Sequence, residues 1–362
     1  MSNINNIEPP LVSVIIPYFN IEDKSKIFQT TFNSVIKQSY PNIEIVLIND
    51  GSTDGSEIIV ENLISRVNDP RILLNHNKLP YNSGPSVARN KGVEVSRGDI
   101  VAFLDCDDVF MPEYLNESIF FFKANTGVDV VLTFAYYYVN FYGLEKVYML
   151  NCLENLNEIN FEELVLYIIK NNFPIPMGSG MICRKGVFSK VLFDEFLSKK
   201  TAEDVDFGYQ LLLNGYRPFF QIKPLIVHRS YLKHISRSRA AFISCDEYII
   251  HEYLFNKSVL FLLEKIKTKI EINRINQIYT ELNFKKVIFE IKRLVFENSK
   301  LKALKICGLN PTLLKHGLRY IFLKVVSRNH FAFLFLTCFS FLRINSNNEF
   351  RKRINQYIYN LQ

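Results

Sequence analysis

The sequence predicts an α/β fold built on a mostly parallel, doubly wound sheet, followed by a helical C-terminal region. In the N-terminal third of the chain, short β-branched runs alternate with stretches of helical periodicity, and this alternation favours parallel strands joined by crossover helices. A content of 48% hydrophobic and 22% charged residues is typical of a globular chain. A length of 362 residues suffices for one large or two ordinary domains.

The predicted elements begin with two buried strands. Residues 11–17 and 43–49 are apolar runs that end at Pro17 and at Asn49-Asp50-Gly51. Residues 25–38, between them, carry apolar side chains near helical spacing, which completes a β-α-β unit. The pattern continues with a helix at 56–68, a strand at 71–75, a helix from 84 or 85 to 95, a strand ending in aspartates, a helix at 112–125 and a strand at 128–140.

Three carboxylates, Asp105, Asp107 and Asp108, follow the apolar run that ends at Leu104. Burying an unpaired acid costs several kcal/mol, so neighbouring acids need a divalent cation or a solvated loop. Open α/β sheets bind ligands at the carboxyl ends of their strands. The Asp-x-Asp pattern is therefore consistent with a Mg²⁺ or Mn²⁺ that carries a diphosphate, while ordinary turn chemistry remains the alternative.

Three further segments contain candidate functional groups. Asp50, at the exit of the second strand, suits a hydrogen bond from a base N–H, although its loop also has the composition of a plain turn. Arg89 lies near the start of a helix, where a cation opposes the helix dipole unless an anionic ligand is near. Glu203 and Asp204 begin another helix; acids there are common, but only one of the two can face a cleft, where it suits a general base.

Several classes of protein are disfavoured by what the sequence lacks. There is no Gly-x-Gly-x-x-Gly and no phosphate loop, which argues against kinases, NTPases and nicotinamide dehydrogenases. The N-terminus has no secretory signal pattern, and the six cysteines are scattered, so a cytoplasmic protein with reduced thiols is expected.

Five segments, in this order, resemble the family 2 glycosyltransferases with the GT-A fold, a Rossmann-like α/β architecture. They are Val-Ser-Val-Ile-Ile-Pro-Tyr-Phe-Asn from residue 12, Asn-Asp-Gly-Ser-Thr-Asp from 49, Ala-Arg-Asn-Lys-Gly from 88, Phe-Leu-Asp-Cys-Asp-Asp from 103 and Ala-Glu-Asp-Val-Asp from 202. The resemblance covers about residues 11–239. It implies a metal-dependent enzyme that moves one sugar, with inversion, from a nucleotide diphosphate to an acceptor hydroxyl.

The resemblance also implies roles for individual residues. Asp50 would bind the uracil or other base, with Pro17 and Phe19 flanking it, and Arg89 would contact the nucleotide. Asp105 and Asp107 would hold Mn²⁺ or Mg²⁺ on the diphosphate. Asp204 would be the catalytic base, with Glu203 as the reserve candidate. The acceptor-side loop would contain Gly178, Ser179 and Gly180.

One motif departs from the family pattern. Tyr231 stands where the family usually has a His near the metal, so His228 or His234 would have to replace it, or the site would do without. A loop His beside a cation is more often simply solvated. The Gln-x-x-Arg-Trp motif of processive relatives is impossible because the chain has no Trp, so a single-transfer enzyme is expected.

The expected organisation is a catalytic domain at 1–244 and a basic, mostly helical region at 245–362. Within the first, the nucleotide-binding half spans about 11–110 and the acceptor-binding half about 111–244. The second contains 20 Lys and Arg against 9 Asp and Glu. Its apolar stretch at 331–342 is shorter than the roughly 20 residues that a spanning helix needs.

Within this region, residues 313–343 consist of two apolar stretches interrupted by cations and leave three hypotheses open. These are binding to an anionic membrane surface, packing within the protein or against a second copy, and nucleic-acid binding, which is the least favoured. The overall hypothesis is a hexosyltransferase of cell-surface polysaccharide biosynthesis, cytoplasmic and peripheral on the membrane, that uses a nucleotide sugar, with UDP expected, and a glycan or lipid-linked acceptor. The alternative is a catalytically dead sugar-nucleotide-binding or scaffold protein.

Overall fold

The structure is a computed structural model. It describes residues 8–141, 144–149, 156–171, 178–198, 203–231 and 255–266, together with residues 270, 280, 356–357 and 359–361. The expected helical region after residue 266 lies almost entirely outside the described residues, and His234 lies outside them as well. Among the helices described, each is too short or too polar to cross a bilayer.

The N-terminal half alternates strands and helices as predicted. The strand predicted at 43–49 is found with those bounds, and the neighbouring elements begin and end within a few residues of the predicted ones. The elements are β1 (Val12–Tyr18), η1 (Glu22–Lys24), α1 (Ser25–Ile36), β2 (Ile43–Asn49), α2 (Ser56–Ile64), β3 (Ile72–Lys78), α3 (Pro85–Val95) and β4 (Ile100–Phe103).

The second half contains both short strands and long ones. Its elements are β5 (Val109–Phe110), α4 (Tyr114–Ala124), β6 (Val130–Phe141), β7 (Leu144–Met149), α5 (Phe161–Asn171), β8 (Met181–Arg184), η2 (Lys185–Ser189), α6 (Glu203–Leu213), β9 (Phe219–Tyr231), η3 (Phe255–Val259) and α9 (Leu260–Ile266).

These strands form one sheet with the order β3-β2-β1-β4-β8-β6-β9-β5, and β7 pairs with β6 outside this path. The first four strands are parallel, as the β-α-β pattern predicts. Beyond β4 the sheet is mixed: β8 is antiparallel to both of its neighbours, and β9 is parallel to β6. The parallel half therefore carries the motifs predicted to bind the nucleotide, and the mixed half extends the sheet beyond them.

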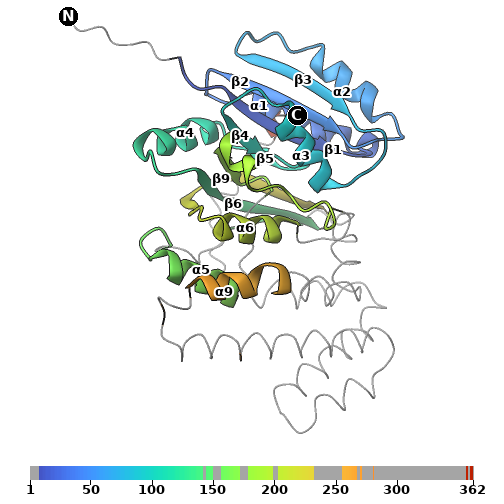
Figure 1. Ribbon diagram of the computed structural model, residues 1–362. Helices are drawn as coiled ribbons and strands as arrows, with labels where there is room; N and C mark the ends of the chain where they lie inside the picture. Colours follow the sequence, from blue (N-terminus) through green and yellow to red (C-terminus); the bar gives the residue numbers. More distant parts are fainter. Residues whose placement is uncertain are drawn as a thin grey trace, which may run out of the picture.

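Helices cover both faces of the sheet. Side chains of α1, α2 and α4 pack on one face, in the hydrophobic cluster that contains Val14, Phe28 and Ile119. Side chains of α3, α5, α6 and α9 pack on the other face, in a cluster that contains Phe103, Phe207 and Leu263. Figure 1 shows α5, α6 and α9 together beside β6 and β9.

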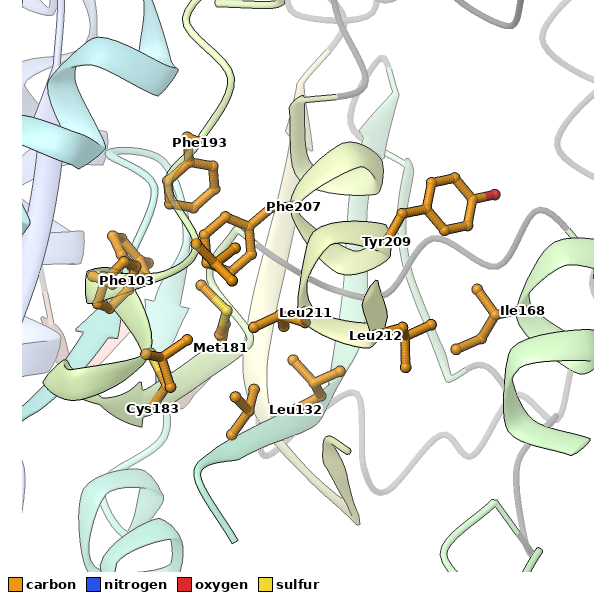
Figure 2. Close-up of a cluster of buried hydrophobic side chains, with 14 of the residues drawn as sticks. Phe103, Leu132, Ile168, Met181, Cys183, Phe193, Phe207, Tyr209, Leu211 and Leu212 are labelled. Carbon is orange, nitrogen blue, oxygen red and sulfur yellow. The ribbon is translucent and has the colours of Figure 1, made fainter. Parts of the chain in front are cut away.

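The second cluster holds α6 against the sheet. Figure 2 shows Phe207 and Leu211 of α6 directed toward the strands that carry Leu132 and Met181, with Leu212 on the side of Ile168 in α5. Phe193 and Phe207 stack with ring centroids 4.3 Å apart, and Phe103 meets Phe193 edge to face. Helix α6 is thus fixed by packing on the sheet on one side and on α5 on the other.

Candidate active site

The predicted site lies at the carboxyl ends of β1 and β4, where the strand order reverses. From β1 the chain moves outward to β3 and then returns to place β4 on the other side of β1. Ligands of open α/β sheets bind in the crevice at such a reversal. The amide of Leu104 donates to Ile15 O at 3.0 Å, so Asp105 follows directly after the last bond between these strands. Pro17 lies near the end of β1, and Phe19 comes directly after the strand.

Arg89 connects three of the predicted motifs. Its guanidinium lies 2.8 Å from Asp105 Oδ1 and 3.1 Å from Glu203 Oε1, and 5.4 Å from the ring centroid of Phe193. The side chain is buried; burial lowers the pKa of Arg89, but Asp105 and Glu203 outweigh it and hold the pKa above its usual value. The loop at residues 104–108, between β4 and β5, is called the aspartate loop below. A buried cation between two carboxylates fixes α3, the aspartate loop and the start of α6 relative to one another.

Glu203 and Asp204 have different surroundings. Glu203 is engaged by Arg89, whereas Asp204 Oδ1 accepts a hydrogen bond from the Val205 amide at 2.8 Å. Burial, followed by the negative charge of Glu203, raises the pKa of Asp204 to about 6. A carboxylate with a pKa near the working pH is well suited to accept a proton. The sequence alone could not separate the two acids, because their difference depends on where Arg89 lies.

Asp108 organises the far side of the aspartate loop. Its Oδ2 lies 2.5 Å from Ser179 Oγ and 2.6 Å from His228 Nδ1, and its Oδ1 accepts from the Arg229 amide at 2.9 Å. The predicted site residues did not include Asp108. Its position as a third acid after Asp-x-Asp was the available signal, but the sequence does not reveal that β9 runs beside β5 and brings His228 to it.

The loop Gly178-Ser179-Gly180 lies directly against the aspartates. Ser179 Oγ accepts from the Asp105 amide at 3.0 Å and also bonds Asp108, so this one hydroxyl bridges both ends of the motif. A Cβ added to Gly178 would lie 2.8 Å from Asp105 Oδ2. Gly180 directly precedes β8, and its carbonyl accepts from the Thr133 amide of β6 at 2.8 Å. The predicted acceptor-side loop is thus in contact with the predicted metal-binding segment.

Asp50 orders the neighbouring loop. Its two carboxylate oxygens accept the amides of Ser83 and Gly84 at 2.7 and 2.8 Å. Gly51, with φ of +66°, lies so close to the backbone of Tyr81 that a Cβ would be 2.3 Å from the carbonyl carbon. These contacts explain why Asp-Gly follows β2: the acid caps the amides that lead into α3, and the glycine allows the close approach.

Asp107 is the residue whose chemistry most favours a bound cation. Burial, followed by the charges of Asp108 and Asp105, raises the pKa of Asp107 to about 7. A divalent cation would relieve this crowding, and oxygen donors suit Mg²⁺ and Mn²⁺. The described residues contain no group of three metal-ligating side chains. This donor set fits a cation held by one or two carboxylates together with substrate phosphates, which is how Mg²⁺ usually binds, but it does not fit a closed protein cage.

His228 is held by Asp108 rather than lying in solvent. Burial lowers the pKa of His228, but Asp108 outweighs it, so the pKa stays above the ordinary value. The protonated ring then stabilises Asp108 as a carboxylate. Arg229, the next residue, was not predicted to have a role; it binds Asp107 O, Ile27 O at 3.0 Å and Thr31 Oγ1 at 2.8 Å. It ties the backbone of the aspartate loop to α1.

Comparison with known proteins agrees with this geometry. The model of the family Glycosyl transferase family 2 matches residues 13–192, which contain β1 to β8 and the aspartate loop. The chain belongs to this family, and its fold is of the GT-A type, as the motif order implied.

Individual relatives are similar over parts of the chain. An uncharacterized glycosyltransferase of Haemophilus influenzae is 40% identical over 116 residues, 32% of this chain and 44% of its own length. The uncharacterized glycosyltransferase YibD of Escherichia coli is 45% identical over 28% of this chain and 27% of its own length. The chain thus spans less than half of each of these relatives. Among solved structures, residues 1–349 of TarS from S. aureus share the fold with a TM-score of 0.54 and 21% identity, covering 88% of this chain and 91% of that one.

Proposed function

We propose that this protein is an inverting glycosyltransferase that moves one sugar from a nucleotide diphosphate to a hydroxyl group of an acceptor. The observation that carries the proposal is the bridge from Arg89 to Asp105 and Glu203, with Asp204 as the next residue. It joins, at one sheet edge, acids that are about a hundred residues apart in sequence. Membership of the family supports the same reaction.

In this proposal Asp204 is the general base. Its carboxylate accepts the proton of the acceptor hydroxyl as the oxygen attacks the anomeric carbon, from the face opposite the leaving diphosphate. One attack from the opposite face inverts the configuration, and a single base is sufficient. A pKa of about 6 leaves Asp204 ionised near neutral pH while keeping it basic enough to take the proton.

Asp107 and Asp105 are the residues that would hold a divalent cation together with the donor diphosphate. Such a cation, Mn²⁺ or Mg²⁺, offsets the negative charge that develops on the leaving group. Within the protein, Arg89 keeps Asp105 oriented, and Ser179 holds the backbone of the same loop. His228 belongs to this segment through Asp108, so we assign it a supporting role next to the cation and not a ligand role.

The binding sites for the donor and the acceptor are assigned from the positions of these residues in the fold. Pro17 and Phe19 at the end of β1, and Asp50 at the end of β2, flank the edge where a nucleotide base would bind, and UDP is the proposed carrier. Gly178, Ser179 and Gly180 lie on the opposite side of the aspartates, where an acceptor hydroxyl must approach. We propose a glycan or lipid-linked acceptor of cell-surface polysaccharide synthesis, with the basic region holding the enzyme on the cytoplasmic side of an anionic membrane.

A panel of nucleotide sugars tests the proposal. The full chain is incubated with each donor and Mn²⁺ or Mg²⁺, with and without candidate acceptors, and release of nucleoside diphosphate is measured. We expect release with one donor class and loss of release in Asp204→Asn. If every donor that binds is left intact, the alternative of a sugar-nucleotide-binding or scaffold protein is correct.

A further inference from the structure

The segment made of η3 and α9 lies across α6, the helix that begins with Glu203 and Asp204. Figure 1 shows this segment beside α6 and α5, and its apolar side chains Leu262 and Leu263 are fully buried in the core that contains Leu211 and Leu212. The segment lies beyond residue 192, where the family match ends. Like α6, it lies outside the matched residues but shares the hydrophobic core with them.

Lys257 in η3 binds two carboxylates. Its Nζ lies 2.8 Å from Asp206 Oδ2 on α6 and 2.6 Å from Asp194 Oδ2 in the loop before α6. Asp206 is fully buried, and Ser258 Oγ lies 3.4 Å from its other oxygen. A buried carboxylate requires such a partner, and removing one member of a buried pair leaves an uncompensated charge. Lys257 is thus the cation that allows Asp206 to lie inside the protein.

The contact bears directly on the first turn of α6. Residues three positions apart share one face of a helix, so Glu203 and Asp206 lie on the same side of α6. One is held by Arg89 from α3, and the other is held by Lys257 from η3. Two cations therefore fix the rotation of this turn about the helix axis. Asp204, one position after Glu203, is presented about 100° away from that face.

The ion pair between Lys257 and Asp194 also connects Lys257 to the candidate active site. Asp194 belongs to the loop whose Phe193 lies under Arg89, and Asn90 exchanges two hydrogen bonds with the Phe193 backbone, at 2.9 and 3.0 Å. Further along, Ser198 Oγ accepts the Ser86 amide at 3.0 Å at the start of α3. Lys257 thus joins the helix of the candidate base to the loop that supports Arg89.

We propose that Lys257 is a positioning residue that sets the orientation of the first turn of α6 and hence of the Asp204 carboxylate. This inference rests on the proposed function. Because its two ion pairs are with Asp206 on α6 and with Asp194 in the loop before it, the loss of Lys257 should misplace the base more than it weakens donor binding. Small displacements of a catalytic group are costly, since rates can fall by up to about 10²-fold for a shift near 1 Å.

The test compares Lys257→Met with a matched control in the same segment, made of η3 and α9. Lys265 Nζ donates to Leu213 O at 2.7 Å at the far end of α6, so Lys265→Met removes a Lys from the same segment without touching the first turn. In Lys257→Met we expect kcat to fall roughly 10- to 100-fold while KM for the donor changes less than about threefold. Lys257→Arg, which keeps the cation, should restore most of the lost kcat, and Lys265→Met should keep the kcat of the unsubstituted enzyme.

The remaining outcomes also decide the proposal. Equal kcat in Lys257→Met and the unsubstituted enzyme, or an equal loss in Lys265→Met, would overturn it. If Lys257→Met does not fold, Asp206→Asn replaces it: this variant removes the ion pair with the first turn of α6 without leaving an uncompensated buried charge on that helix, and an unchanged kcat there would equally refute the positioning role. If the unsubstituted enzyme consumes no donor, the proposed function itself fails, which is distinguishable from failure of this inference.

Discussion

At the scale of single residues, the candidate site is an arrangement of charges whose members differ by burial and by partner. Arg89 neutralises Asp105 and Glu203, His228 accompanies Asp108, and the remaining acids, Asp107 and Asp204, have pKa values raised by burial and by their acidic neighbours. Perturbed acids in a crevice are typical of functional sites. The two raised pKa values therefore mark the residues to substitute first.

Asp204→Asn is expected to lower kcat by a factor on the order of 10² or more, because the amide cannot accept the acceptor proton. Donor affinity should stay nearly the same, since Glu203 remains on Arg89. In the unsubstituted enzyme the base must be ionised, so kcat should fall as pH falls through about 6, the raised pKa of Asp204. Steady-state kinetics between acid and neutral pH give both results, and an equal fall in donor affinity would indicate a structural role instead.

Asp107→Asn is expected to weaken metal binding at the site. Replacing a charged oxygen by an amide should raise the Mn²⁺ concentration for half-maximal activity on the order of tenfold or more. The measurement is activity against Mn²⁺ concentration after removal of metal with a chelator. Asp129→Asn, at a half-exposed acid paired with Arg184 away from the site, is the control. An activation curve that does not move would argue against Asp107 as a ligand.

At the scale of elements, the aspartate loop is held by the secondary structure around it. The loop connects β4 with β5, and β5 pairs with β9, whose Arg229 reaches back to the loop and to α1. Thr31 of α1 completes this contact by donating to Cys106 O at 3.1 Å. The geometry of the acids therefore depends on a strand that lies more than a hundred residues later in sequence.

Arg229→Met should lower the free energy of unfolding by about 3 kcal/mol, because several buried acceptors lose their charged donor. Urea denaturation followed by circular dichroism measures the change. Arg217→Met, at a half-buried Arg that also binds backbone carbonyls, at Leu156 and Asn157, is the matched control for stability. It should leave donor turnover unchanged in the folded protein, whereas Arg229→Met should reduce it; equal turnover in both variants would contradict the link to the loop.

At the scale of the whole molecule, the end of the chain returns to the first helix. Asn33 Nδ2 donates to Leu361 O at 2.8 Å, and Tyr357 OH donates to Phe110 O at 3.0 Å. Leu361 is buried beside Val109 and Val227, and Figure 1 shows the C-terminus against the N-terminal half. The last residues therefore pack against the N-terminal half, while residues 313–343, to which the packing and membrane hypotheses apply, lie outside the described residues.

Leu361→Ala should cost about 2–4 kcal/mol of unfolding free energy, the usual range for truncating a buried Leu. Tyr359→Ala, at a side chain that is 73% exposed, is the control and should cost much less. Chemical denaturation of the full chain measures both. Equal stability of the two variants would show that the C-terminal contact contributes nothing in solution.

The cations and apolar side chains of residues 313–343 predict reversible binding to anionic vesicles. Each well-placed Lys or Arg contributes about 1 kcal/mol near such a surface, and salt screens the attraction. Co-sedimentation with anionic and with neutral vesicles is measured for the full chain and for a variant in which the Lys and Arg residues of 313–343 are replaced by Gln. This variant keeps the contact of Tyr357 and Leu361 with the N-terminal half. Identical sedimentation would exclude these residues as the anchor. The cations are Lys315, Arg319, Lys324, Arg328 and Arg343.

The sequence by itself determined the parallel half of the fold and the edge at which the site lies. Hydrophobic runs with period-specific spacing placed β1, β2 and β4. Because parallel strands end at one edge of the sheet, Asp50 after β2 and Asp105 after β4 were expected together. These are local properties, so local patterns suffice to predict them.

Only the tertiary structure decided which acid meets which cation. The partners of Arg89 lie 16 and 114 residues away, and Lys257 reaches Asp206 from 51 residues beyond it. The boundary predicted at residue 244 stays a prediction, although the core continues through Leu262 beyond it. No periodicity encodes such contacts, because they follow from how strands β8, β6 and β9 extend the sheet and where α6 packs on it.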